Sequence, residues 1–157
     1  MPVQNPPNGN TAVTPHLIIE GAAKAIEFYK QAFDAIELFR MDGPGGKIMH
    51  AQIAINGANI MLCDAMPEKG AHGPKRGEPN SSFIYLYIAD ADHTMKKAVA
   101  AGAKVLREVE THFYGDRAGL IVDPFGHTWW ISTHVEDVSM DELKKRAAEM
   151  QKKQSAA

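Results

Sequence analysis

The strongest constraint on the fold of this chain is an internal repeat. A shift of 69 residues places the helix-forming stretch 22–32 on 91–101 and the turn glycine Gly57 on Gly126. Apolar runs and turn residues coincide in both halves without a gap. A fixed period of this kind is typical of a duplicated structural unit, so we predict two copies of one supersecondary element.

Each copy has the pattern of a strand, an amphipathic helix and three further strands. Alternating apolar residues predict the strands, and an apolar period of three to four residues predicts the helices. In the first copy the elements are expected at 14–19, 22–33, 35–41, 47–55 and 59–63. In the second copy they are expected at 83–88, 91–101, 104–111, 117–122 and 127–133. The predicted fold class is therefore α+β, with two βαβββ modules curled around a cavity suited to a small molecule.

The predicted organisation is one domain with an extension at each end. The domain covers 14–135, with module one at 14–63, a linker loop at 64–81 and module two at 82–135. Residues 1–13 are expected to form a flexible lead. The segment 136–157 should contain a helix that a capping box at 139–142 opens and that runs to about residue 150. The linker is long for a compact domain, and long loops are often functional.

Charge and cysteine content exclude several classes of partner. The formal net charge is −2 and the pI is about 6.4, so the chain has no electrostatic basis for binding nucleic acid or an anionic membrane. The one cysteine, Cys63, forms no internal disulfide, and residues 1–14 lack the basic and apolar regions of a signal peptide. We expect a cytoplasmic protein that binds a small, roughly neutral organic molecule.

The alternation along the strands predicts which side chains face the cavity. Leu17 and Ile19 are expected to pack under the helices, and Met49 and Ala51 are expected to share one face of their strand. The opposite faces carry large side chains with polar groups, which ligand cavities use to orient a bound molecule. The candidates for the cavity face are His16, Phe83, Tyr85 and Tyr87 on the leading strands, His50 and Gln52 on the strand 47–55, and Met61, Cys63, Trp130 and Ser132 on the last strands.

Five segments carry recognisable motifs, among them Ala-Ile-Glu-Phe-Tyr-Lys-Gln-Ala-Phe and Asp-Pro-Phe-Gly-His. They lie at 15–20, 25–33, 47–51, 115–117 and 123–129. Together they resemble the vicinal oxygen chelate superfamily, which includes glyoxalase I, bleomycin-resistance proteins and extradiol dioxygenases, and in particular its PhnB-like branch. The resemblance covers about residues 13–136. It implies paired βαβββ modules, a cup-shaped half-barrel and a homodimer.

Metal-dependent members of that superfamily hold a divalent ion on the first and last strands of both modules. The matching positions here are Thr14 or its neighbour His16, Met61, Phe83 and Trp130. Zn²⁺ and related ions require imidazole, carboxylate or thiolate ligands, so three of the four positions do not suit them and the standard site is expected to be lost. An offset site for Zn, Mn, Ni or Fe remains an alternative, with ligands from His16, His50 and either Gln52 or Cys63.

One function compatible with these residues is catalysis. An enzyme of this superfamily, lyase-like, isomerase-like or dioxygenase-like, would transfer protons on a polar organic substrate. Its catalytic groups would be His50, His16 and Gln52. The groups that position the substrate would be Tyr85, Trp130, Phe83, Met61 and Tyr87, with Arg117 either holding an anionic end or forming a salt bridge within its module.

The alternative function is binding without catalysis. Bleomycin-resistance members sequester a planar molecule between aromatic walls, and the aromatic candidates of module two favour this hypothesis. The cluster of His16, His50 and Gln52 favours the enzyme. Each candidate also has an ordinary structural alternative, such as a hydrogen-bonded histidine at a strand start or an aromatic residue that fills the core. A third hypothesis is a scaffold whose cavity is vestigial.

Overall fold

The computed structural model describes residues 3–7, 9–75, 78 and 80–155, and its first module is a four-stranded sheet with one helix. The elements are β1 (His16–Ile19), α1 (Ala22–Phe33), β2 (Ile36–Asp42), β3 (Ile48–Ile55) and β4 (Ala58–Asp64), with short 3₁₀ turns at Pro44–Gly46 and Pro67–Lys69. The strand order is β1-β4-β3-β2. The pair β1 and β4 is parallel, and the other pairs are antiparallel.

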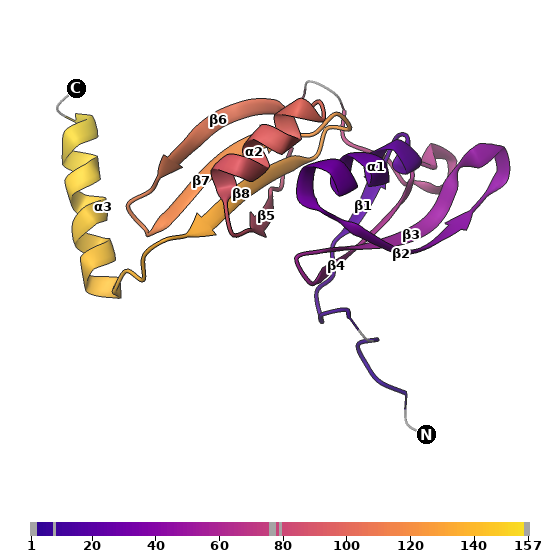
Figure 1. Ribbon diagram of the computed structural model, residues 1–157, viewed down its shortest axis with the longest axis horizontal. Coiled ribbons are helices and arrows are strands. Elements are labelled where there is room, and N and C mark those ends of the chain that lie inside the picture. Colours follow the sequence, from indigo (N-terminus) through magenta and orange to yellow (C-terminus); the bar gives the residue numbers. More distant parts are fainter. Residues whose placement is uncertain (1–2, 8, 76–77, 79, 156–157) are drawn as a thin grey trace.

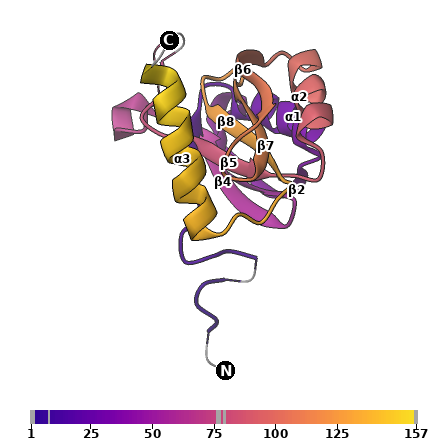
Figure 2. The ribbon, with the colours of Figure 1, turned by 90° about the vertical axis from the view of Figure 1, so that its left-hand side faces the viewer.

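The second module repeats this arrangement, so the predicted α+β fold of two βαβββ modules is confirmed. Its elements are β5 (Ile84–Tyr87), α2 (Ala91–Ala100), β6 (Lys104–Thr111), β7 (Asp116–Val122) and β8 (Thr128–His134). The order β5-β8-β7-β6 again has one parallel pair, β5 with β8. The last helix, α3 (Met140–Ser155), stands at the far end of module two, on the left in Figure 1 and in front in Figure 2.

The two helices α1 and α2 lie side by side and cover the same side of the two sheets (Figure 1). Their apolar faces and the facing sides of both sheets form one continuous core, which includes Ile26 and Tyr29 from α1, Met95 from α2, and Leu62 and Ile131 from the sheets. Leu17 and Ile19 are buried in it, as the strand alternation predicted. Burial of these surfaces removes apolar area from water and is the main stabilising contribution to the fold.

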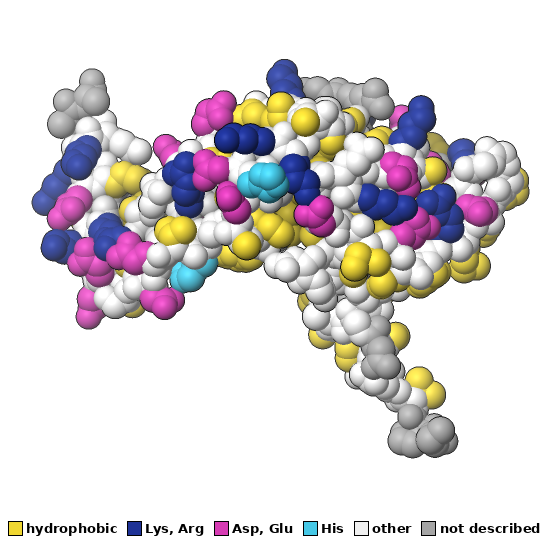
Figure 3. Space-filling view, viewed as in Figure 1, with side chains coloured by type: hydrophobic (Ala, Val, Ile, Leu, Met, Phe, Trp, Pro, Cys, Tyr) yellow, Lys and Arg dark blue, Asp and Glu magenta, His cyan; other side chains and the backbone are white. Residues whose placement is uncertain are grey.

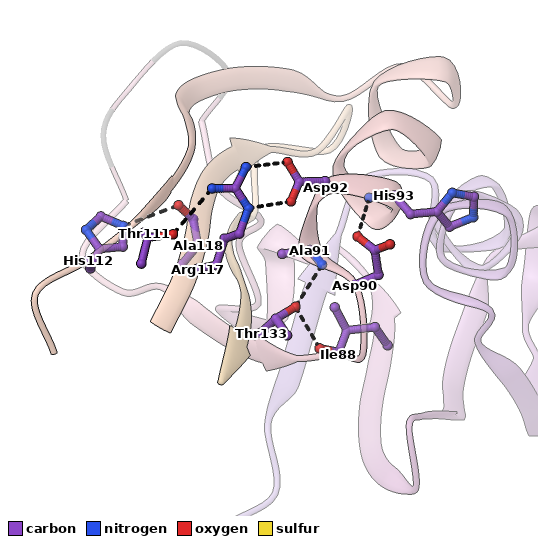
Figure 4. Close-up of polar contacts among 10 residues, drawn as sticks. All are labelled: Ile88, Asp90, Ala91, Asp92, His93, Thr111, His112, Arg117, Ala118 and Thr133. Atoms are coloured by element: carbon purple, nitrogen blue, oxygen red, sulfur yellow. Dashed lines mark hydrogen bonds and ion pairs between the residues drawn. The ribbon is translucent and has the colours of Figure 1, made fainter. Parts of the chain in front are cut away.

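The repeat found in the sequence holds at the level of strand register. His16 lies opposite Met61 in module one, and Tyr85 lies opposite Trp130 in module two. Each pair is related to the other by the shift of 69 residues. The start of each helix is also capped from equivalent positions, because Asp64 Oδ1 accepts the backbone N–H of Ala22 while Thr133 Oγ1 accepts that of Ala91 (Figure 4).

Asp64 has a larger structural role than Thr133. Its buried carboxylate also accepts the backbone N–H groups of Gly21 at 3.0 Å and of Ile48 at 2.7 Å. It thereby joins β4 to the start of α1 and to β3. Gly21 has φ 90°, a left-handed conformation that glycine adopts without steric strain, and this turns the chain from β1 into the helix.

The modules are joined by polar contacts as well as by the core. The Tyr29 hydroxyl on α1 donates to Asp123 Oδ2 at 2.7 Å, and the Trp129 indole N–H donates to the same oxygen at 2.9 Å. Across the seam between the modules, the Asn56 side chain donates to the Tyr87 carbonyl and His127 Nε2 donates to the Ile18 carbonyl. The relative position of the two sheets is therefore defined by hydrogen bonds at both ends of the seam.

Two details differ from the sequence-based expectation. A register shift between Met41 and Asp42 interrupts the β2–β3 ladder, so Ile48 is buried and Met49 is exposed instead of sharing the core face of Ala51. The helix α3 extends to Ser155 instead of ending near residue 150. Its last turns carry lysine and glutamine, which are good helix formers, and the basic residues Lys152 and Lys153 complement the helix dipole.

The surface carries both signs of charge. On the face shown in Figure 3, basic and acidic side chains are interspersed over α2 and α3, without a large patch of one sign. A mixed surface of this kind exerts little long-range attraction on a polyanion. Within the described part of the chain, no helix is both long enough and apolar enough to cross a membrane.

Removal of the buried cap of α1 tests this account of the fold. Asp64→Ala leaves three backbone N–H groups without an acceptor, and we expect the free energy of unfolding in urea to fall by about 3 kcal/mol. Thr133→Val removes the equivalent but simpler cap of α2 and should cost about 1 kcal/mol. Asp42→Ala, at an exposed strand end, is the matched control. An equal loss in all three variants would contradict the structural role of Asp64.

Candidate functional site

Each sheet has a side that faces away from the helices, which we call its open face. The open face of the first sheet carries His16, His50, Gln52, Phe39 and Met61. The open face of the second sheet carries Phe83, Tyr85, Tyr87, Trp130 and Ser132, with Asp116, Ala118 and Leu120 from β7. Of the sequence-predicted site residues, Arg117 lies on neither open face, and Cys63, Gln52 and Ser132 are buried.

Two histidines meet on the open face of the first sheet. The rings of His16 and His50 have centroids 5.5 Å apart at an interplanar angle of 84°, and Phe39 packs on His50 at 5.6 Å. Partial burial, together with the nearby charge of His50, lowers the pKa of His16. His16 is therefore neutral near pH 7, and a neutral imidazole can accept a proton or ligate a metal ion.

The other candidates of the first sheet are engaged or buried. The Gln52 side chain donates to Asn10 Oδ1, which also accepts from Asn59 at 3.1 Å. Gln52 therefore anchors the segment that precedes β1. Cys63 is 5% exposed, and burial followed by the nearby Asp64 carboxylate raises the pKa of its thiol. A thiol in this setting is a poor nucleophile and a poor metal ligand.

An exposed row of aromatic side chains runs along β5 on the second sheet and begins at the residue before it. Phe83, Tyr85 and Tyr87 are 57%, 46% and 52% exposed, which is high for aromatic residues. Trp130 lies beside this row and is 9% exposed. Its ring centroid is 6.0 Å from that of Tyr85 and 6.4 Å from that of Phe83. Trp130 is therefore mostly buried beside the row, and the exposed aromatic surface comes from Phe83, Tyr85 and Tyr87.

The remainder of Trp130 is covered by residues that the sequence did not single out. The turn after β6 folds over the open face, so that His112 stacks on Tyr114 at 5.0 Å and lies 5.6 Å from Trp130. His112 Nε2 donates to the Ala118 carbonyl, which holds this turn against the sheet. Arg107 on β6 places its guanidinium carbon 5.7 Å from the centre of the Trp130 ring. Ala118, Leu120 and Trp130 are thus buried in a small second apolar cluster.

A buried carboxylate organises one end of the aromatic row. Asp116 accepts hydrogen bonds from the Tyr87 hydroxyl at 3.0 Å, from Ser132 at 3.1 Å and from His134 Nδ1 at 2.7 Å. Burial alone would raise the pKa of Asp116, but these donors outweigh burial and lower it. His134 Nε2 lies 3.0 Å from Asp137, and the two carboxylates raise the pKa of the imidazole, Asp116 more than Asp137.

Arg117 lies on the other side of β7. It forms a bidentate pair with Asp92 at the start of α2, at 2.6 and 2.7 Å, and also contacts Thr111 (Figure 4). The sequence left two alternatives for Arg117, a clamp for an anionic ligand or a salt bridge within the module. The structure places it in the salt bridge, because alternation along β7 directs it to the helix side.

A cavity of about 310 Å³ lies at the seam between the modules, between β1, β5 and the linker loop. Its polar lining includes three imidazoles, from His16, His72 and His127, together with Asn80 and Ser82. Its volume is at the lower end of the range for small-molecule pockets. His16 belongs both to this cavity and to the open face of the first sheet.

The strand register refines the comparison with the metal-binding positions of the superfamily. His16 pairs with Met61, and Tyr85 pairs with Trp130, so the equivalent pair in module two begins at Tyr85 and not at Phe83. Only His16 of these four side chains is an effective ligand for a borderline divalent ion. Among the described residues, no three or more His, Cys, Asp or Glu side chains are grouped so that they could hold a metal ion.

Simple alternation could not have identified Arg107. Val105 and Val109 pack on the main core, and strict alternation would place Arg107 with them. Register shifts between Val105 and Arg107 and between Arg107 and Glu110 turn Arg107 to the open face. The only available signal for His134 was its spacing of four residues from Trp130 on one strand, which puts both on the same face.

The contact between His134 and Asp116 predicts a pH dependence of stability. Because the pKa of His134 is raised, its contribution to the free energy of unfolding is fully present below about pH 6.5. This contribution is lost as the pH rises through the raised pKa. Because the pKa of Asp116 is lowered, its contribution is present above about pH 4 and is lost as the pH falls through the lowered value.

We therefore expect the free energy of unfolding to decline as the pH rises above about 6.5, and His134→Gln to remove this decline. Urea unfolding at a series of pH values checks the stability, and an NMR titration of the imidazole checks the pKa. His93→Gln, at an exposed position on α2, is the matched control. A His134 pKa below about 6.5 in the folded protein would refute the assignment.

The fold and the sequence both match known proteins. The family model of the Glyoxalase/Bleomycin resistance protein/Dioxygenase superfamily matches residues 12–131. An uncharacterised protein of Mycobacterium tuberculosis is 42% identical over 142 residues, which are 87% of this chain and 82% of that protein.

Solved structures show the same fold. The X-ray structure of an Arabidopsis thaliana gene product has a TM-score of 0.63 and 29% identity, and the match covers 78% of this chain and 98% of that chain. A PhnB protein of Bacillus cereus has a TM-score of 0.58 and 19% identity, over 78% and 99% of the two chains. Since the family model spans most of the chain, the protein belongs to the Glyoxalase/Bleomycin resistance protein/Dioxygenase superfamily, the vicinal oxygen chelate superfamily that its motifs resemble.

Proposed function

We propose that this protein binds a small organic molecule on the open face of the second sheet. The observation that carries the proposal is the row of Phe83, Tyr85 and Tyr87, three neighbouring aromatic side chains that are about half exposed. Contiguous apolar surface on a soluble domain marks interaction sites, because leaving it in water is unfavourable. Aromatic residues with a polar end are also the side chains that orient flat ligands.

The geometry of the row supports a flat ligand. Tyr85 and Tyr87 have ring centroids 5.2 Å apart and an interplanar angle of 36°, and the buried Trp130 ring supports Tyr85 from a centroid distance of 6.0 Å. The hydrogen bond to Asp116 holds the Tyr87 ring in one position. A preorganised aromatic surface loses little conformational entropy when a ligand stacks on it.

A proton-transfer enzyme is the second candidate function. The edge-to-face contact between His16 and His50, and the position of His16 at the seam cavity, support it. The lowered pKa of His16 leaves its imidazole able to act as a base at neutral pH. In this candidate, the substrate would enter the seam cavity, and the aromatic row would not contact the reacting atoms.

The donor set does not fit the metal site of the superfamily. Of the four positions in equivalent register, Met61, Tyr85 and Trp130 are unsuited to a hard or borderline divalent ion. An offset site would rest on His16 and His50, because Gln52 binds Asn10 and Cys63 is buried. We therefore propose that the protein works without a metal ion.

We also propose a homodimer. Ile36, Leu38 and Met41 are 65%, 47% and 55% exposed on β2, which is the outer edge of the first sheet. An apolar edge strand is prone to pair with another chain unless it is covered. This surface is separate from the aromatic row on β5.

We further propose that the protein belongs to the PhnB-like branch of the superfamily, on the basis of the motifs at 25–33 and 123–127. We propose the cytoplasm as its location.

A neutral flat probe tests the proposed binding. We expect 2-naphthalenemethanol to bind weakly in isothermal titration calorimetry, and Tyr85→Ala to lower its affinity about tenfold, since the loss of one aromatic contact amounts to about 1.4 kcal/mol. His50→Ala, on the other sheet, should leave the affinity unchanged. The opposite result, in which His50→Ala abolishes binding and Tyr85→Ala has no effect, would favour the seam and the second candidate function.

Native mass spectrometry tests the oligomer and the metal content together. The chain has a mass of 17.2 kDa, and we expect a species of twice that mass without a bound ion, from protein grown with zinc, manganese, nickel and iron and purified without chelator. Leu38→Glu should convert this species to the monomer, because it places a charge in an apolar contact. A stoichiometric metal that is lost in His16→Ala would overturn the proposal of metal-free function.

A further inference from the structure

The guanidinium of Arg107 lies over Trp130, with its central carbon 5.7 Å from the centre of the ring. The Trp130 side chain is 9% exposed. Its buried indole N–H makes no hydrogen bond of normal geometry among the described residues, and the Tyr114 hydroxyl lies near it. Arg107 is therefore the group on this face whose donors are accessible to a ligand.

No carboxylate among the described residues pairs with the Arg107 guanidinium. Asp116 is bound by His134, Tyr87 and Ser132. Glu110 lies 3.9 Å from His112 Nδ1. Within the described part of the chain, the Arg107 guanidinium has neither a hydrogen bond nor an ion pair, in contrast to those of Arg117, Arg40 and Arg146, which pair with Asp92, Glu37 and Glu136. Arg107 is thus held over an aromatic ring with its five N–H donors available.

We propose that the ligand of this face is an aromatic anion, a flat ring that carries a carboxylate, sulfonate or phosphate group. This inference rests on the proposed binding function and names the class of its ligand. The ring stacks on the row of Phe83, Tyr85 and Tyr87, and the anionic group accepts hydrogen bonds from Arg107. The planar guanidinium matches two oxygens of such a group at once, which gives orientation as well as affinity.

The same geometry disfavours a cationic ligand. Aromatic faces attract cations, but Arg107 already lies over Trp130 and would repel a second positive charge there. The buried carboxylate of this face, Asp116, is enclosed by its three donors, Tyr87, Ser132 and His134. Arg107 therefore places a positive charge on this face, in register with Leu120, Trp130 and Tyr85, the middle residue of the aromatic row.

Three probes with the same aromatic ring distinguish the contribution of ligand charge to the affinity from the contribution of stacking. They are naphthalene-2-carboxylate, the neutral 2-naphthalenemethanol and the cationic 2-(aminomethyl)naphthalene, each titrated into the intact wild-type protein by calorimetry. We expect the carboxylate to bind at least about tenfold more tightly than the alcohol, and the amine most weakly. Arg107→Gln should abolish the preference for the carboxylate and leave the affinity for the alcohol unchanged.

The matched control is Lys104→Gln, which removes one positive charge from an exposed position on the same strand and should not alter the preference. A second readout is the indole N–H resonance of Trp130, assigned with Trp130→Phe, which should shift with the carboxylate and less with the alcohol. Thermal unfolding of each variant establishes that it is folded.

The outcomes distinguish this inference from the function on which it rests. Equal binding of the carboxylate and the alcohol, both weakened by Tyr85→Ala, would overturn the anionic class but leave the binding function standing. An equal loss of preference in Arg107→Gln and Lys104→Gln would also overturn it, because the effect would then be general electrostatics. If no naphthalene probe binds, the proposed binding function fails and the inference fails with it.

Discussion

The carboxylate of Asp123 is the interaction on which the two-module architecture depends. It accepts hydrogen bonds from Tyr29 on α1, from Trp129 on β8, and from the backbone N–H groups of Phe125 and His127 in the turn between β7 and β8. A buried carboxylate is tolerated only where donors replace its lost hydration, and here the donors come from both modules. This explains the motif Asp-Pro-Phe-Gly-His physically, because its first residue binds two of the backbone groups that follow it.

Packing around Asp123 places the open faces of the sheets. The Trp129 ring contacts the rings of Tyr29 and Phe33 at 5.3 and 4.8 Å, so β8 is held directly against α1. The two helices then cover one side of both sheets, and the opposite sides are left for other uses. Since the faces belong to separate sheets that meet only at a seam, the histidine pair and the aromatic row form two different chemical environments. Binding on the second sheet and proton transfer at the seam are therefore separable hypotheses.

The second sheet shows how irregular strands create a site. Regular alternation along β6 would bury Arg107 or point it toward the helices. Bulges rotate it over Trp130 instead, and the turn that contains His112 and Tyr114 folds back over the same ring. As a result, Trp130 is buried on this face, and Phe83, Tyr85 and Tyr87 supply its exposed aromatic surface. Alternation along the strands predicts aromatic residues on this face. It does not predict which of them are buried, as Trp130 is, and which are exposed.

The repeat, the order of the elements and the helix-facing residues of the regular strands were determined by the sequence alone, because period-two and helical apolar patterns report local geometry directly. The same alternation placed His16 and His50 on one face and Phe83, Tyr85 and Tyr87 on another. Only the tertiary structure decided that Arg117 pairs with Asp92, that Gln52 binds Asn10, and that Arg107, His112 and His134 join the second face. These outcomes depend on bulges, on a turn that folds back and on partners distant in sequence, and none of them leaves a local pattern in the chain.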